Sequence, residues 1–172
     1  MSLNNFDPEK AENNADIEMH WAIKAIQHAE TYFNLLTAFP SDKIKLTKYD
    51  NQIYEAFRKE FPNMKIDIVQ EINDFKTEAA KSKWRNFIEK LMESIDLDDY
   101  NFGTLLRNNC TLEYSEENSF FVTRIQFLCV EIARNVEKFN ECLKGRPPVP
   151  VDDTDMKAEL DILQERIVKQ LN

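Results

Sequence analysis

Apolar residues recur at steps of three and four along most of the chain, which is the spacing of one face of an α-helix. The first stripe lies between Asp16 and Pro40 and consists of Ile17, Trp21, Ala25, His28, Tyr32 and Leu36. The second follows a capping-box pattern at 47–50 and consists of Ile53, Tyr54, Phe57 and Phe61, before Pro62. The third begins near Lys76 and contains Ala80, Trp84, Phe87, Ile88 and Leu91. These stripes predict three helices.

A further helix is predicted near the C-terminal end of the folded region. Its stripe consists of Phe121, Ile125, Leu128, Cys129, Ile132, Val136, Phe139 and Leu143. Gly145 stands just past the last of these, where a glycine often ends a helix. The secondary structure of two segments is less clear from the pattern. Residues 64–75 fit a short strand or a helix, and residues 95–118 follow neither period.

The pattern therefore predicts an all-α protein, a bundle of about five helices over residues 16–145. Residues 1–15 are polar, which is typical of a flexible arm. Residues 146–151 are rich in proline and predict a stiff linker. Residues 152–172 predict a separate amphipathic helix, whose stripe is Met156, Leu160, Leu163, Ile167 and Leu171. This helix has three possible roles: packing on the bundle, docking on a partner, or dimerisation. We expect a monomer.

Composition excludes several classes of function. The chain has two glycines, so it contains neither a Walker A loop nor a dinucleotide fingerprint, both of which need several. The net charge of −9 disfavours nucleic acid and anionic membranes as partners. There is no apolar run of membrane-spanning length and no secretory signal. Three cysteines, an odd number, indicate reduced thiols and a cytoplasmic location.

Motifs for catalysis or metal binding are not evident. The cysteines at 110, 129 and 142 form no CxxC pair. His28-Ala29-Glu30 matches only the first half of a zinc deaminase signature. Asp153-Thr154-Asp155 matches the Asp-x-Asp pattern that holds a metal in many glycosyltransferases, but acids at a helix N-terminus explain it better. We expect a protein that is not an enzyme and needs no cofactor or metal.

The segment from Glu93 to Glu117 is the most distinctive part of the chain. It holds seven acids and one base, Arg107, so it carries a charge of −6 out of −9. It also holds Tyr100, Phe102 and Tyr114. Aromatic rings within an acidic segment are typical of an interface for a basic partner. An equally weighted alternative is a solvated loop that joins two helices by burying Phe102 and its leucine neighbours.

The same segment carries a resemblance to a known family. The residues concerned are Asp99–Arg107 (DYNFGTLLR), Glu113–Asn118, Arg124–Phe127 and Glu131–Asn135, with Asp16–Glu18, Trp21–Ala22, His28–Tyr32, Lys45–Lys48 and Lys83–Arg85 upstream. In this order they resemble the eukaryotic family labelled polysaccharide biosynthesis domain-containing protein 1. The resemblance covers roughly residues 14–140.

This resemblance implies an orthogonal helical bundle and a dedicated chaperone for newly made elongation factor 1-alpha. Such a chaperone engages the GTP-binding domain of that factor during translation, near the ribosome and the nascent polypeptide-associated complex. The binding positions implied are Tyr100, Asn101, Phe102, Gly103, Arg107, Glu116, Glu117, Asn118, Arg124 and Arg134, and the acidic segment adds Asp98 and Asp99. Some of these can be structural, because Glu131 and Arg134 have the i,i+3 spacing of a helical ion pair.

Two alternatives stand beside the chaperone. One is a scaffold subunit of a larger assembly, attached through the helix at 152–172. The other, which the family label favours, is a protein of sugar-nucleotide or polysaccharide biosynthesis.

Overall fold

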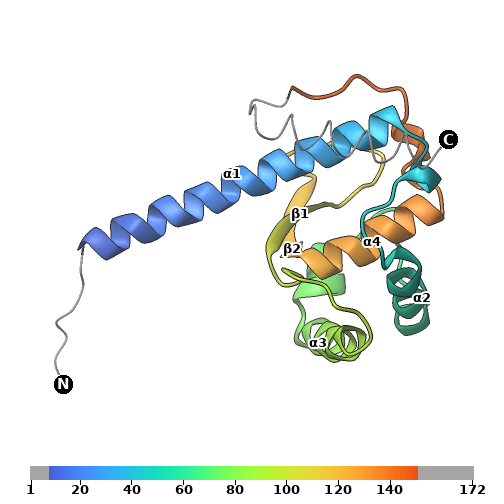
Figure 1. Cartoon of the computed structure of the whole chain (residues 1–172), viewed down its shortest axis with the longest axis horizontal. Coiled ribbons are helices and arrows are strands. Elements are labelled where there is room, and N and C mark those ends of the chain that lie inside the picture. Colours follow the sequence, from blue (N-terminus) through green and yellow to red (C-terminus); the bar gives the residue numbers. More distant parts are fainter. Residues whose placement is uncertain (1–7, 151–172) are drawn as a thin grey trace.

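The computed structural model describes residues 8–150, with side chains from His20 onward. The predicted helix at 152–172 and the first part of the predicted arm therefore lie outside the described residues. The longest element is α1, Pro8–Ala38, so this helix begins well before Asp16. Proline is favoured at the first position of a helix, where its missing N–H would have no partner. Figure 1 shows α1 as a long rod with only its C-terminal half against the rest of the protein.

Three further α-helices follow the predicted stripes. They are α2, Asp50–Glu60, α3, Glu78–Met92, and α4, Arg124–Val136. Short 3₁₀ helices lie at Ser41–Lys43 and Glu141–Leu143, and a π-helix lies at Glu71–Lys76. The stripe residues Ile53, Phe57, Trp84, Phe87 and Leu91 are all buried. None of the helices described is long and apolar enough to cross a membrane.

The prediction of an all-α protein is wrong, because the chain contains a two-stranded antiparallel sheet. β1, Gly103–Arg107, pairs with β2, Ser119–Thr123. The paired residues are Gly103 and Thr123, Thr104 and Val122, Leu105 and Phe121, Leu106 and Phe120, and Arg107 and Ser119. Along β2 the buried Phe120 and Val122 alternate with the exposed Phe121, which is the period of a strand with one face in the core.

The helix predicted from Phe121 therefore begins later, at Arg124. Gln126 Oε1 accepts hydrogen bonds from the backbone N–H of Thr123 at 3.0 Å and from its hydroxyl at 3.1 Å. This Thr-x-x-Gln arrangement is a capping box, in which the third helical residue reaches back to satisfy the N-cap. It fixes the boundary between β2 and α4.

The ambiguous segment at 64–75 contains elements of both kinds. Ile68 forms an isolated antiparallel bridge with Asn109, and Val69 N–H donates to Asn108 O at 2.9 Å. The chain then enters the π-helix, which places Phe75 in the core. A short strand-like stretch and a helical turn thus follow each other within a dozen residues.

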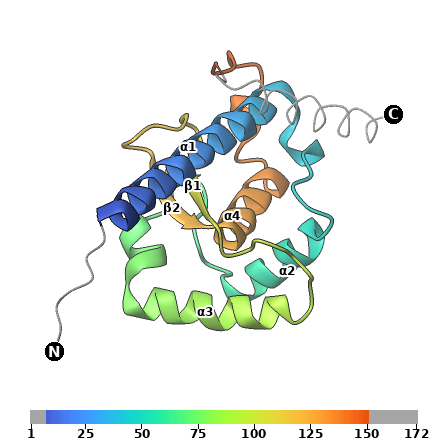
Figure 2. The same ribbon diagram turned by 60° about the vertical axis from the view of Figure 1, so that its left-hand side comes forward.

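The core has three layers. The hairpin and α4 lie between α1 on one side and α2 and α3 on the other (Figure 2). Between α2 and α3 the Trp84 ring stacks on Phe61 at 4.4 Å and on Phe75 at 5.4 Å, measured between ring centroids. Its indole N–H donates to Asp74 O at 2.8 Å, so the one polar atom of this buried ring is satisfied.

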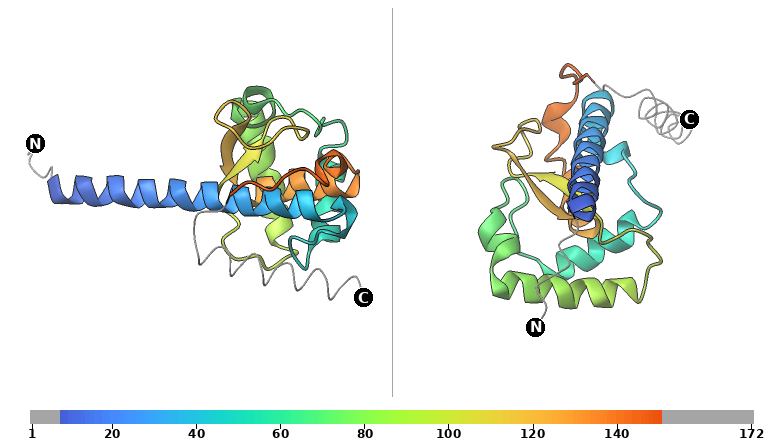
Figure 3. Two further views of the ribbon diagram at one scale, coloured as in Figure 1. Left: turned by 90° about the horizontal axis from the view of Figure 1, so that it is seen from above. Right: turned by 90° about the vertical axis from the view of Figure 1, so that its left-hand side faces the viewer.

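The segment that follows α4 returns to α1 instead of leaving the domain. Gly145, at φ 84°, donates its N–H to Thr37 O at 2.8 Å. The side-chain amide of Asn34 bonds both backbone groups of Val149, at 2.9 and 2.8 Å. The described part of the predicted linker therefore runs antiparallel to α1 and packs beside it (Figures 1 and 3).

Candidate functional site

The loop that leads into β1 is held firmly against the start of α4. Tyr100 O accepts from Ile125 N–H at 2.8 Å, and Phe102 O accepts from Arg124 N–H at 2.7 Å. These bonds satisfy two of the N–H groups that a helix N-terminus leaves without intrahelical partners. Between them the Phe102 side chain stays 52% exposed. The loop thus presents a large aromatic ring on a rigid frame.

Helix α1 supplies a second aromatic ring beside the first. Trp21 is 61% exposed, and its ring centroid lies 6.1 Å from that of Phe102. Two turns further along α1, His28 packs edge-on against Phe127 at 5.5 Å, and its Nδ1 lies 3.4 Å from Thr104 Oγ1. Exposed aromatic pairs are uncommon away from binding sites, because they leave apolar area in water.

These side chains surround a pocket of about 390 Å³. Its lining is His20, Trp21, Lys24, Ala25, His28, Phe102, Gly103, Thr104 and Arg124. We call it the Trp21–Phe102 pocket. It collects basic groups on a protein whose net charge is −9. Among the described residues neither Lys24 nor Arg124 has an ion-pair partner, so the positive charge of the pocket is not neutralised internally.

The surroundings of the pocket lower the pKa of His28. Part of its ring remains open to the pocket, but desolvation against the core and repulsion by Arg124 both lower the pKa of His28. The neutral imidazole is therefore favoured, with one ring nitrogen free to accept or donate a hydrogen bond. The pocket combines two aromatic faces, two unpaired cations and a neutral histidine, which suits a ligand group with an apolar body and a negative charge.

The acidic segment does not form one continuous surface. Asp98, Asp99 and Asn101 are exposed in the loop beside the Trp21–Phe102 pocket, whereas Glu116 and Glu117 are exposed in the connection between β1 and β2. These two groups lie at opposite ends of the hairpin, about 17 Å apart for a five-residue strand. The predicted site is therefore divided by the strand that runs through it.

Two of the predicted binding residues, Arg107 and Arg134, lie in the core and present no surface to a partner. Both have fully buried side chains and share the buried carboxylate of Glu131. Arg134 Nη1 lies 2.7 Å from Glu131 Oε1 and Arg107 Nη2 lies 3.2 Å from Oε2. The pairing predicted from the i,i+3 spacing of Glu131 and Arg134 is confirmed.

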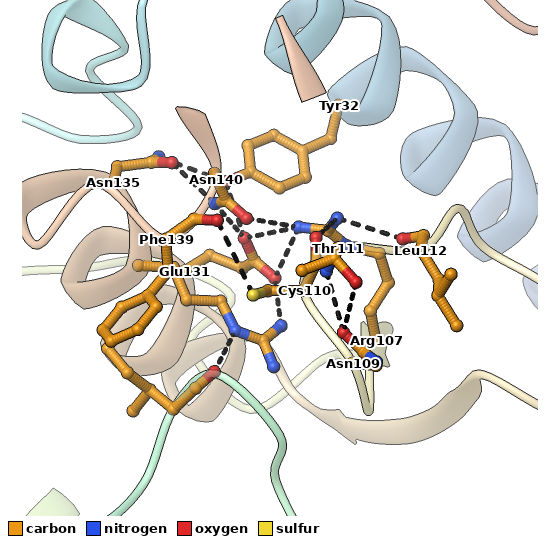
Figure 4. A network of polar contacts seen from close by, with 12 residues as sticks. Tyr32, Arg107, Asn109, Cys110, Thr111, Leu112, Glu131, Asn135, Phe139 and Asn140 are labelled. Carbon is orange, nitrogen blue, oxygen red and sulfur yellow. Dashed lines mark hydrogen bonds and ion pairs between the residues drawn. The ribbon is translucent and has the colours of Figure 1, made fainter. Parts of the chain in front are cut away.

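Glu131 is the centre of a wider polar network, drawn in Figure 4. It also accepts hydrogen bonds from the Tyr32 hydroxyl and from Asn140 Nδ2, both at 2.9 Å. Burial alone would raise the pKa of Glu131, but the charges of Arg107 and Arg134 and these hydrogen bonds outweigh it and lower that pKa to about 2. The network is ionised, fully enclosed and structural.

Asn118, another predicted binding residue, is also structural. It is buried, its Oδ1 accepts from Asn109 N–H at 2.8 Å, and its Nδ2 donates to Asn109 O and Glu113 O at 3.1 and 2.9 Å. These bonds close the long connection between the strands. Asn118 therefore shapes the loop that carries Glu116 and Glu117.

Among the described residues, the remaining chemistry-bearing side chains do not assemble into a metal site. Cys110 and Cys129 are buried and Cys142 is exposed, each as a free thiol. Within the described part of the chain, no group of three or more His, Cys, Asp or Glu side chains is placed to hold a metal ion.

Sequence reasoning missed the contribution of α1 to the site. The apolar stripe placed Trp21 on the same helix face as Ala25 and Tyr32, which are buried, but Trp21 is 61% exposed. The apolar stripe continues past the point where the core ends. Comparing the length of the helix with the size of the core would have indicated that Trp21 is exposed.

In the described residues, the fold and the site define a small, mainly helical domain with a β-hairpin and two exposed aromatic rings side by side. A family model described as PBDC1 protein matches residues 17–145. The chain belongs to this family.

Relatives agree with this assignment. The chain is 48% identical over 136 residues to Protein PBDC1 of Mus musculus, covering 79% of this chain and 67% of the relative. It is 47% identical over 131 residues to Protein PBDC1 of Homo sapiens, of whose length it spans 55%. It is 42% identical over 147 residues to the Protein PBDC1 homolog of Saccharomyces cerevisiae, covering 84% of this chain and 99% of the relative.

A solved structure supports the fold. The solution NMR structure of protein yst0336 from Saccharomyces cerevisiae superimposes with a TM-score of 0.70 at 42% identity. The match covers 86% of this chain and 100% of that chain. The mixed helical and β architecture is therefore shared with a relative.

Proposed function

We propose that this protein is a non-enzymatic chaperone that binds newly synthesised elongation factor 1-alpha, through its GTP-binding domain, during translation. The observation that carries the proposal is the exposed pair Trp21 and Phe102, whose ring centroids lie 6.1 Å apart on a fixed backbone. Large aromatic side chains in such positions supply most of the binding energy at protein interfaces. A holding chaperone needs such a surface and needs no nucleotide site of its own.

The charges around the pair support a protein partner of mixed charge. Lys24 and Arg124 line the Trp21–Phe102 pocket, while Asp98 and Asp99 are exposed in the loop that leads to Phe102. A partner with an acidic group for the pocket and basic residues around it would match both. The net charge of −9 would add long-range attraction to a basic client, which raises the association rate and fades with salt.

The decisive experiment is a binding titration with the purified GTP-binding domain of elongation factor 1-alpha. Phe102→Ala should weaken binding by about tenfold or more, the effect of losing a hot-spot aromatic. The matched control is Phe121→Ala, because Phe121 is 53% exposed against 52% for Phe102 but lies on β2, outside this pocket. Both side chains are on the surface, so neither change should unfold the domain.

Three outcomes separate the possibilities. Weaker binding by the Phe102 variant alone supports the proposal and places the client at the pocket. Equal affinities for both variants and the parent chain remove the pocket from the interface. No binding by the parent chain, shown to be folded by circular dichroism, refutes the chaperone role.

Charge reversal then tests which end of the hairpin faces the client. Asp98→Lys with Asp99→Lys should reduce the association rate more than Glu116→Lys with Glu117→Lys, because only the first pair lies in the loop that carries Phe102. Both double variants change the net charge equally, so a difference between them reports position and not total charge.

A further inference from the structure

A second, apolar groove of about 500 Å³ lies along α1. Its lining includes Ala22, Ile26, Ala29 and Phe33 from α1, Phe121 from β2, and Tyr114, Glu116 and Val149. Ile26 is 49% exposed and Phe121 is 53% exposed. On α1 the groove is lined by Ala22, Ile26, Ala29 and Phe33, whereas the Trp21–Phe102 pocket is lined by Trp21, Lys24 and His28, so the two sites lie on different sides of the helix.

The described chain ends at this groove. The residues after α4 run antiparallel to α1, from Gly145 beside Thr37 to Val149 beside Asn34. Val149 is itself part of the groove lining. Figures 1 and 3 show the segment following α1 away from its C-terminal end. The next 22 residues, 151–172, thus leave the described domain at one end of an exposed apolar groove.

The spacing of apolar residues in that stretch matches the groove. Along α1 the lining residues step from Phe33 to Ala29, Ile26 and Ala22, which is four, three and four positions. In the amphipathic stripe the steps from Met156 to Leu160, Leu163 and Ile167 are also four, three and four. An antiparallel helix would therefore place Met156 opposite Phe33, Leu160 opposite Ala29, Leu163 opposite Ile26 and Ile167 opposite Ala22.

We infer that residues 151–172 bind in this groove of the same chain, as an amphipathic helix antiparallel to α1. The large Leu160 and Ile167 then face alanines, and the apolar area of Ile26 and Phe121 is removed from water. Both stripes span eleven positions, about 16 Å for helices. Pro150 and Val151 alone separate the anchored Val149 from the predicted helix start, which keeps the segment near the groove.

The covalent link favours this occupant over a second molecule. Lys157 and Arg166 flank the stripe on its two sides, and the exposed Glu116 lies at the rim of the groove. A short tether also gives a segment of the same chain a local concentration of the order of millimolar, which an intermolecular competitor rarely reaches. Any partner that uses the groove must displace the segment, while the Trp21–Phe102 pocket stays open.

The inference is tested by disulfide trapping in the full chain. In a Cys142→Ser background the remaining cysteines are buried. Ile26→Cys combined with Leu163→Cys should oxidise within one chain about tenfold faster or more than Lys24→Cys combined with Leu163→Cys, because proximity sets the rate. Lys24 is the matched control, since it lies on the same stretch of α1 but lines the other pocket.

Each result has a definite meaning. A fast link within one chain for the Ile26 pair alone supports docking in the groove. Equal rates for both pairs, or no link for either, refute it. Links between two chains refute it in favour of a second copy as the occupant.

An independent measurement uses amide NMR spectra of full-length variants. Leu160→Asp with Leu163→Asp should shift the amide signals of Ile26, Ser119 and Phe121, which border the groove. Glu165→Lys, on the opposite side of the predicted helix from the stripe, should leave these signals in place. Unchanged groove signals in the double variant would overturn the inference even if the domain were otherwise intact.

Discussion

Replacing Glu131 by glutamine removes the one negative charge of the buried network while keeping the shape of the side chain. Glu131 accepts hydrogen bonds from Tyr32, Arg107, Arg134 and Asn140. A glutamine offers one acceptor oxygen, and its NH₂ group would face donors. Two guanidinium groups would also remain buried without a counter-charge, and breaking such a buried pair typically costs about 3–5 kcal/mol.

The pKa of Glu131 gives a second route to this magnitude. That pKa falls from 4.5 to about 2 on folding, and each unit corresponds to ~1.4 kcal/mol, so ionised Glu131 contributes about 3 kcal/mol. Because the folded-state pKa is lowered, the stabilisation is present above pH 4.5 and is lost as the pH falls towards 2. The free-energy gap between the parent chain and Glu131→Gln should therefore narrow as the pH is lowered from 5.

Urea unfolding followed by far-UV circular dichroism measures this gap. Glu137→Gln is the control, since Glu137 binds Arg58 through both oxygens, at 2.6 and 2.8 Å, but the two side chains are 26% and 21% exposed. That change should cost about 1 kcal/mol or less, as for other solvent-accessible pairs. If Glu131→Gln costs no more than the control at pH 7, the assignment of the network as an ionised structural centre is incorrect.

Three further expectations follow from single contacts. Gln126→Ala removes the capping box with Thr123 and should lower the free energy of unfolding by about 1 kcal/mol in the same urea assay, and no loss would mean that the cap is dispensable. Arg124→Ala removes a repulsive charge, so the pKa of His28 measured by NMR should rise towards its ordinary value, and an unchanged pKa would place Arg124 elsewhere. In the native chain a thiol reagent should modify Cys142 quickly and spare the two buried thiols, whereas rapid labelling of all three would contradict the burial of the others.

The sequence predicted α2 and α3 because their stripes coincide with real core faces. It failed at the hairpin because β2 is followed directly by α4. The step of four from Phe121 to Ile125 joins two elements into one apparent helical stripe. The Thr123-x-x-Gln126 capping box was the local signal that separates them. The partner of β2 is sixteen residues upstream on average, and such pairing leaves no periodic trace.

The sequence predicted part of the candidate site and missed the rest. The segment 93–117 was singled out by its composition, and the structure places one of its residues, Phe102, in the lining of a pocket. Arg107 and Arg134 were named as binding positions from the family resemblance, but both side chains are fully buried. Their burial depends on a shared carboxylate and on backbone acceptors, such as Ile66 O at 2.6 Å from Arg134 Nε. These partners come together only in the folded chain, so the sequence pattern does not show them.

The wide sequence span of the Glu131 network bears on how this domain can be made. Its members come from α1, β1, α4 and the turn after α4, from Tyr32 to Asn140. A ribosome delivers these segments in order, so the carboxylate cannot meet all its donors until nearly the whole domain has emerged. Contacts between such distant positions also slow folding, since long loops must close first. The domain should therefore acquire its stability late in its own synthesis and in a single step.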